Sequence, residues 1–287
     1  MHALMDEVGG DRDPLEVVLE RARELVADAR AIGWSGPPFD PVVLAGLQTI
    51  RARPSDASMD SDALIRALAD GSLEILWDDS SAVTRRNFSI CHELGHTLFP
   101  DAYEVVRHRS ARRRDLEDEL ERLCDAAAAE MLMPAEEFAQ DLVGCDLTGD
   151  TVVALARRYV ASPEATARRI ATLSERPCAA MLLTMRLKPT EARRASQTGF
   201  DFGGGVYAPA PRLRVDYMVP SRTFTARFPP HKSIPDDSCA YGALDGNGSG
   251  TEAWSTGQAT VSLHVNALSI AGDSEGRQRV LALVTQA

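Results

Sequence analysis

The spacing of hydrophobic residues predicts a mainly helical first part of the chain. Between residues 14 and 32 the apolar positions recur every three or four residues, which is the period of an amphipathic helix. The same signal predicts further helices over 41–51, 83–98 and 115–133. We expect the last two to end before Pro100 and Pro134, because the residue before a proline disfavours the helical conformation.

Shorter patterns complete this first part. Residues 73–77 alternate loosely between apolar and polar positions and predict a strand, whereas the polar residues 55–62 predict a loop or the start of a helix. Residues 151–159 and 163–173 predict two helices joined by a short turn, the arrangement of a helix-turn-helix.

After Arg176 the pattern becomes strand-like. Glycine and proline become frequent, and the apolar runs shorten to 179–187, 213–219, 259–270 and 280–284. We therefore expect an α+β protein of two domains. Residues 1–176 are expected to form a mainly helical domain with a small sheet that includes the helix pair at 151–173, and residues 177–287 a strand-rich domain.

Composition excludes several classes of protein. With 287 residues, 44% hydrophobic and 25% charged, the chain has the make-up of a soluble globular protein. No apolar run approaches the roughly 18 residues of a membrane span, and the N-terminal residues lack the order of a signal peptide. We therefore expect a cytoplasmic protein with no membrane partner. The five cysteines form no Cys-x-x-Cys pair, which argues against a disulfide framework or a zinc ribbon.

The charge is acidic but uneven. A net charge of -11 argues against an all-over nucleic-acid binder. Arginines crowd residues 107–114, directly before the acidic run 115–121. A solvated, self-paired segment is the simpler interpretation, and a basic arm that meets an acidic substrate or phosphates is the alternative.

The clearest chemical signal is the sequence His92-Glu93-Leu94-Gly95-His96 inside a predicted helix. Histidines four residues apart lie on one helix face, so both imidazoles can bind one metal ion. Glu93 follows the first ligand and is placed to take a proton from a water at the metal rather than to bind the metal itself.

The rest of this helix is expected to pack against the protein. Phe88, Cys91, Leu94 and Leu98 follow helical spacing on the opposite face and are expected in the core. Gly95 is a poor helix former, which suggests that another backbone passes close to it.

Two histidines leave a catalytic zinc site one protein ligand short. Carboxylates are plentiful between residues 115 and 137, so spacing has to select among them. Glu121 and Asp125 are four apart on one predicted helix, which allows Glu121 to bind the metal while Asp125 accepts the free ring proton of a ligand histidine. Glu137 and Asp141 share this spacing but come after the predicted helix end, and spacing alone is a weak criterion in so acidic a segment.

Two motifs in the same order resemble the ImmA/IrrE metallopeptidases. Residues 86–96 look like the active-site helix of that family. The segment from Glu121 through the alanine-rich residues 126–130 to Met131-Leu132-Met133-Pro134 is similar to the helix that follows it in the family. The resemblance covers about residues 69–173. Cys124 stands where alanine is usual and Asp125 where asparagine is more frequent.

This resemblance implies a zincin-like peptidase core with His92, His96 and Glu121 as Zn²⁺ ligands and Glu93 as the catalytic residue. It also implies that the partner is a protein substrate, a helix-turn-helix repressor that is cut in a stress, DNA-damage or phage-defence response. The strand-rich domain fits the GAF-like sensor domain of some members, for which a nucleic acid or a small molecule is a candidate activator.

Two other functions compete with this one. The first is a general or toxin-like peptidase without a dedicated repressor. The second is a DNA-binding regulator that uses residues 151–173 and keeps a structural or vestigial zinc site. Only Arg168 and Arg169 cluster on the second helix of that pair, too few for a convincing phosphate footprint, and an intact Glu93 favours an enzyme.

Several secondary expectations follow. A thiolate from Cys239 or Cys145 would block the zinc, since both lie in Gly- or Asp-rich loops, although all five cysteines are inert in the alternative interpretation. The candidate oxyanion donors are Tyr103, His108 and Tyr159. By analogy with zincins, the strand at 73–77 is expected to pair with an extended substrate segment.

Overall fold

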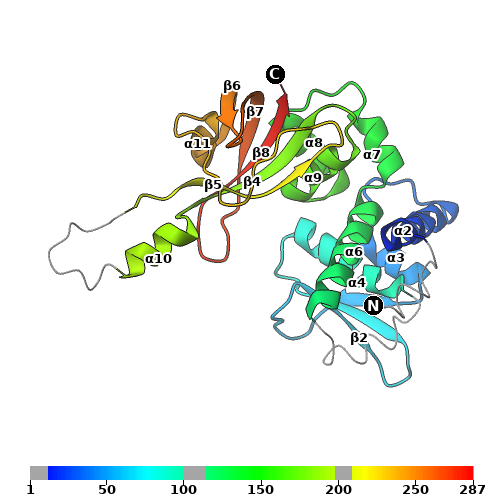
Figure 1. Cartoon of the computed structure of the whole chain (residues 1–287). Coiled ribbons are helices and arrows are strands. Elements are labelled where there is room, and N and C mark those ends of the chain that lie inside the picture. The colour runs from blue at the N-terminus through cyan, green and yellow to red at the C-terminus, as the bar shows by residue number, and fades with distance from the viewer. Residues whose placement is uncertain (1–11, 100–113, 198–208, 287) are drawn as a thin grey trace. The chain divides into compact units, whose positions relative to one another are not determined.

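The computed structural model describes residues 12–99, 114–197 and 209–286 (Figure 1). The chain forms two compact units, Met1–Asp141 with Leu155–Ser162, and Leu142–Ala154 with Pro163–Ala287. Each unit combines helices with one sheet, so the expected α+β class is confirmed. None of the helices described is long and apolar enough to cross a membrane.

The first unit is built around three packed helices. Its helices are α2 (Pro14–Ala31), α3 (Pro41–Leu47), α4 (Val83–Thr97), α6 (Arg114–Leu132) and α7 (Ala135–Leu142). Helix α6 packs against both α2 and α4, and its buried positions include Cys124, Ala127 and Ala128. The Asp13 carboxylate caps the start of α2 by accepting the Leu15 N–H at 3.0 Å.

Two helix boundaries differ from the prediction. The helix expected over 41–51 ends at Leu47, because Thr49 adopts a left-handed conformation (φ 58°) and the chain enters a strand at Arg51. Helix α7, which was not predicted, begins directly after Pro134. The proline ends one helix and also precedes the first turn of the next, where its missing N–H costs nothing.

The small sheet of the first unit consists of β1 (Arg51–Pro54), β2 (Ala63–Ala67) and β3 (Leu73–Trp77), in the order β1-β3-β2. Strand β3 has the predicted bounds, but β1 pairs with it in parallel on one side and β2 antiparallel on the other. The expectation that residues 73–77 pair with a substrate is therefore wrong, because both edges of β3 are already used. The edge strand that contacts α4 is β2.

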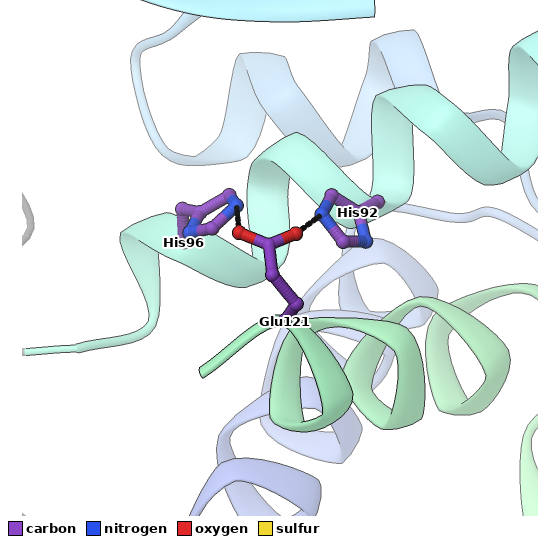
Figure 2. A group of neighbouring side chains, drawn as sticks. All are labelled: His92, His96 and Glu121. Atoms are coloured by element: carbon purple, nitrogen blue, oxygen red, sulfur yellow. Dashed lines mark hydrogen bonds and ion pairs between the residues drawn. The ribbon is translucent and has the colours of Figure 1, made fainter. Parts of the chain in front are cut away.

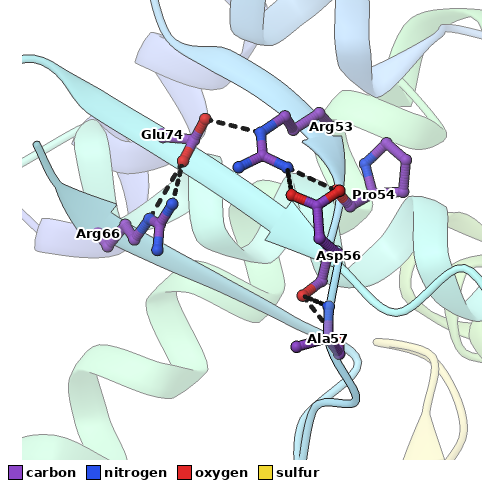
Figure 3. A network of polar contacts seen from close by, with 7 residues as sticks. Arg53, Pro54, Asp56, Ala57, Arg66 and Glu74 are labelled. Atoms are coloured by element: carbon purple, nitrogen blue, oxygen red, sulfur yellow. Dashed lines mark hydrogen bonds and ion pairs between the residues drawn. The ribbon is translucent and has the colours of Figure 1, made fainter.

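An ion-pair network holds the three strands together (Figure 3). The Glu74 side chain on β3 is 3% exposed and accepts hydrogen bonds from Arg66 at 2.6 Å and Arg53 at 3.0 Å. The bonds from Arg66 keep the pKa of Glu74 below its usual value, against the opposing effect of burial. Because these arginines lie on the two flanking strands, the buried carboxylate cross-links the whole sheet.

The second unit is built on an antiparallel sheet of five strands in the order β5-β4-β8-β7-β6. The strands are β4 (Cys178–Arg186), β5 (Arg212–Pro220), β6 (Asn247–Ser255), β7 (Thr260–Ile270) and β8 (Arg279–Gln286), accompanied by α9 (Pro163–Leu173), α10 (Pro189–Gln197) and α11 (Cys239–Gly242). Phe224, Phe228 and Trp254 belong to the core of this unit. Four strands follow the predicted apolar runs. Strand β6 was missed, because its first residues are Asn-Gly-Ser-Gly and carry no apolar signal.

Both predicted helices of the 151–173 pair are present, as α8 (Gly149–Tyr159) and α9. The boundary between the two compact units passes through this pair, because α9 packs on β4 and β5 of the second unit. Ala167, Ile170 and Ala171 form the fully buried face of α9. The boundary proposed at residue 176 thus comes after the point where the packing changes from one unit to the other.

Candidate metal centre

Helices α4 and α6 bring three candidate ligands to one point in the first unit (Figure 2). His92, His96 and Glu121 each offer one ligand atom, and these atoms all lie within 4.8 Å of one another. His92 Nε2 is 2.9 Å from one Glu121 oxygen, and His96 Nε2 is 3.6 Å from the other. The two imidazole nitrogens therefore face the same carboxylate.

The close approach of the two helices depends on Gly95. A Cβ atom at this position would lie 3.0 Å from the Cys124 Cα and 3.1 Å from the Cys124 carbonyl oxygen, both of them backbone atoms that cannot easily move. The expectation that another backbone passes close to Gly95 is confirmed. Glu121 precedes Cys124 by about one helical turn. The contact at Gly95 therefore also fixes the position of Glu121 relative to the two histidines on α4.

The outer nitrogen of each histidine ring has its own partner. Asp125 Oδ1 lies 2.9 Å from His92 Nδ1 and can accept the proton on that nitrogen, so that Nε2 is the nitrogen available to a metal when the ring is neutral. The Cys124 Sγ lies 3.4 Å from His96 Nδ1 and is fully buried. Asp125 was predicted in this position, whereas Cys124 was noted as standing where alanine is usual in the family. Its place three residues after Glu121, on the face toward α4, is the signal that would have identified it.

The donor set fits a metal ion. Two imidazole nitrogens and one carboxylate oxygen are the protein ligands of one class of catalytic zinc sites, which keep a further position for water or substrate. His96 is 2% exposed and His92 17%, whereas Glu121 is 44% exposed. The histidines are thus fixed by the core, and the centre is open to solvent on the side of Glu121.

Glu93 lies beside this group and is not one of its members. Its side chain is 7% exposed, and one carboxylate oxygen accepts the Ile65 N–H of β2 at 3.0 Å. The edge strand therefore positions this carboxylate next to the first histidine. A buried carboxylate that follows His92 and lines the same pocket, outside the ligand group, is consistent with the general base expected from the sequence.

The other candidates of the sequence fall elsewhere. Cys145 and Cys239 both belong to the second unit, and burial raises the pKa of the Cys239 thiol to about 12, which disfavours a thiolate ligand. A zinc-blocking role for either stays a prediction.

Among the candidate oxyanion donors, Tyr159 has structural contacts. Its hydroxyl donates a hydrogen bond to Asp141 at 2.8 Å, and its ring packs on the ring of Phe138. Tyr103, His108 and the arginines 107–113 lie outside the described residues.

The competing carboxylate pair has other partners. Glu137 forms an ion pair with Arg30, and Asp141 accepts from both Arg158 and Tyr159. Neither carboxylate joins the group that includes the histidines. Of the two pairs with four-residue spacing, the structure therefore places Glu121 and Asp125 at the histidines.

Metal uptake is expected to depend on pH through His92. Burial lowers the pKa of this imidazole, but hydrogen bonds and charges from Asp125 and Glu121 outweigh it and raise the pKa from 6.5 to about 9. In the metal-free protein the protonated ring therefore stabilises the fold at pH below 6.5, and this contribution is lost as the pH rises through about 9.

Since a metal competes with that proton, its affinity should rise by about tenfold per pH unit until His92 is neutral. Chelator competition between pH 6 and pH 9 measures this slope, and the metal-free protein should lose thermal stability over the upper part of that range. An affinity that is constant with pH would contradict the assigned ion pairs.

Removal of the outer partners should weaken metal binding in a graded way. Asp125→Ala is expected to lower the affinity by about ten- to a hundredfold, because the His92 ring loses the carboxylate that orients it. Cys124→Ala should have a smaller effect, since a thiol is a weak acceptor. Chelator competition on each variant checks both values, and Cys91→Ala, which removes a buried thiol from α4, is the matched control. An unchanged affinity in Asp125→Ala would contradict this order.

Two histidines on one helix, a glutamate from a second helix and an adjacent buried carboxylate form the arrangement that the sequence predicts for a metallopeptidase site. Residues 49–171 match the model of the Peptidase_M78 family, described as the IrrE N-terminal-like domain. Residues 49–171 thus form an IrrE N-terminal-like domain, and the resemblance to the ImmA/IrrE metallopeptidases noted in the two motifs is confirmed.

The fold as a whole is also similar to a solved structure. A protein described as a Mycobacterium tuberculosis transcriptional regulator aligns with a TM-score of 0.56 and 13% sequence identity, over 96% of this chain and 82% of the other. At this identity the likeness shows the fold alone. No match was found among curated protein sequences.

Proposed function

We propose that this protein is a zinc-dependent endopeptidase that cleaves a specific helix-turn-helix repressor in a stress, DNA-damage or phage-defence response. The observation that carries the proposal is the convergence of His92, His96 and Glu121, with Glu93 outside the ligand group. A peptidase domain acts on a protein substrate, and the two-nitrogen, one-oxygen donor set favours zinc.

The protein's own residues supply orientation and proton transfer. Zinc, when bound by the two Nε2 atoms and Glu121, polarises the scissile carbonyl and lowers the pKa of a water molecule. Glu93 removes the proton from the attacking water and later delivers it to the leaving amine. The Ile65 N–H holds the Glu93 carboxylate in position for both transfers, and Asp125 keeps the His92 proton on Nδ1.

Strand β2 is the segment best placed to hold an extended substrate. In its antiparallel ladder with β3, main-chain groups of alternate residues point toward β3 or away from it. The Ile65 N–H donates to Glu93, so Ala63, Ile65 and Ala67 direct their main-chain groups away from β3. A substrate segment that adds to this edge would bring its backbone next to Glu93.

The second unit is proposed to act as a GAF-like sensor. The proposal is supported by a five-stranded antiparallel sheet with α9 packed on β4 and β5. A nucleic acid or a small molecule is the proposed activator, and it would couple a cellular signal to the peptidase.

A DNA-binding role for the α8–α9 pair has less support. Arg169 is 8% exposed, so it is mostly withdrawn from the surface. The guanidinium of Arg168 lies 5.6 Å from the centre of the Tyr217 ring, in a cation–π contact. Of the two clustered bases of α9, only Arg168 is therefore exposed, which is too little for a phosphate footprint.

Cleavage of candidate repressors tests the proposed function. The zinc-loaded protein is incubated with helix-turn-helix proteins encoded next to its gene and with an unrelated unfolded protein, with and without candidate activators. A discrete product from one repressor supports the proposal. Cleavage of all proteins alike would identify a general peptidase, and zinc binding with DNA binding but without cleavage would identify a regulator.

A further inference from the structure

A pocket of about 320 Å³ lies at the N-terminal side of the histidine pair on α4. Its lining includes His92 and Glu93 of the candidate metal centre. Two short segments form the rest of its wall. Asp62 lies just before β2 and Ala63 at its start, and Arg85, Phe88 and Ser89 belong to α4. Ligand pockets range from about 300 to 1,000 Å³, so this one lies at the lower end of that range and has room for one large side chain.

Phe88 provides the apolar wall of this pocket. It was expected in the core together with Cys91 and Leu94, but it is only half-buried, whereas those two are completely buried. Its ring centre lies 6.5 Å from that of His92, one helical turn further on. A partly exposed aromatic ring beside the reactive groups offers apolar surface that a ligand can remove from water.

The charged groups of the pocket wall are already paired. The Arg85 Nε donates to one oxygen of Asp62 at 2.7 Å, and the Ser81 hydroxyl donates to the other at 2.8 Å. A basic side chain would have to displace Arg85 from Asp62. An acidic side chain would be repelled by Glu93, which lines the same pocket. The pocket therefore favours a neutral occupant that packs on Phe88 and Ala63.

We propose that this pocket is the specificity subsite of the peptidase and receives a large apolar side chain, aromatic or long aliphatic, from a residue that flanks the scissile bond. The inference rests on the proposed function, because the zinc centre and the edge of β2 define where the substrate backbone passes. It makes Phe88 and Ser89 specificity-determining residues: Phe88 contributes contact area, and the small Ser89 leaves room.

Binding of hydroxamates, which chelate zinc, tests the subsite without requiring cleavage. Amino-acid hydroxamates with glycine, leucine, phenylalanine, aspartate or lysine side chains are titrated by calorimetry into the zinc-loaded full chain. The leucine or phenylalanine probe should bind at least about tenfold more tightly than the glycine probe. Phe88→Ala and Ser89→Leu should both remove this preference. Val83→Ala is the matched control, since Val83 is 46% exposed on the same helix and does not line the pocket.

The other outcomes separate the subsite from the zinc centre. Equal affinity for all probes, or the tightest binding of the aspartate or lysine probe, would overturn the apolar subsite and leave the metal centre intact. A preference that persists in both Phe88→Ala and Ser89→Leu would also overturn it. If no probe binds to the zinc-loaded protein, or if zinc itself does not bind, the proposed function fails together with the subsite.

Discussion

Replacement of Glu121 by alanine is expected to remove the metal as severely as replacement of His92. Both imidazole Nε2 atoms face the Glu121 carboxylate, so the variant loses one of three protein ligands and not only an outer partner. The affinity should therefore fall by more than the roughly hundredfold upper limit for outer partners. Zinc content after dialysis, followed by chelator competition, measures the loss.

Glu119→Ala is the matched control for this experiment. Glu119 lies on the same helix and carries the same charge, but it does not belong to the ligand group. This variant should bind zinc like the unmodified protein. If Glu121→Ala kept its zinc while Glu119→Ala or Glu117→Ala lost it, the choice of carboxylate would be wrong.

Replacement of Glu93 by glutamine should abolish cleavage while zinc binding and folding are preserved. The amide oxygen of glutamine can still accept the Ile65 N–H, so the side chain keeps its position, but it cannot take a proton. General-base catalysis contributes about a hundred- to ten-thousandfold to a rate, and the cleavage rate should fall by that amount. Single-turnover cleavage, zinc content and a thermal melt are measured on the same sample. A variant that cleaves at the original rate would remove the general-base assignment.

The parts of the site that are local in sequence could be predicted without a structure. The four-residue spacing of His92 and His96 places both rings on one helix face whatever the surrounding fold. The strand at 73–77 and the ends of α4 and α6 also follow from local pattern and from proline positions. The choice of Glu121 among many nearby carboxylates rested on weak spacing and on the family resemblance, and its physical reason is the contact between α4 and α6 at Gly95 and Cys124.

The features that sequence reasoning missed depend on tertiary packing. Whether Phe88 faces the core or a pocket depends on how β2 crosses α4, which the helical period does not report. The pairing of β3 on both sides likewise arises from β1 and β2, which are short and were not predicted. The sequence places Cys124 three residues after Glu121, but its 3.4 Å contact with His96 depends on how α4 and α6 pack.

X-ray absorption spectroscopy of the zinc-loaded protein tests the proposed centre most directly. The three-ligand site predicts one zinc per chain, with imidazole scattering from two histidines and with oxygen and nitrogen ligands at about 2.0–2.2 Å. The same spectrum tests the proposed block by Cys145 or Cys239, which would add one sulfur at about 2.3 Å to the histidine signal. A protein that retains no zinc, or a zinc shell without the signal of two histidines, would contradict the His92, His96 and Glu121 centre.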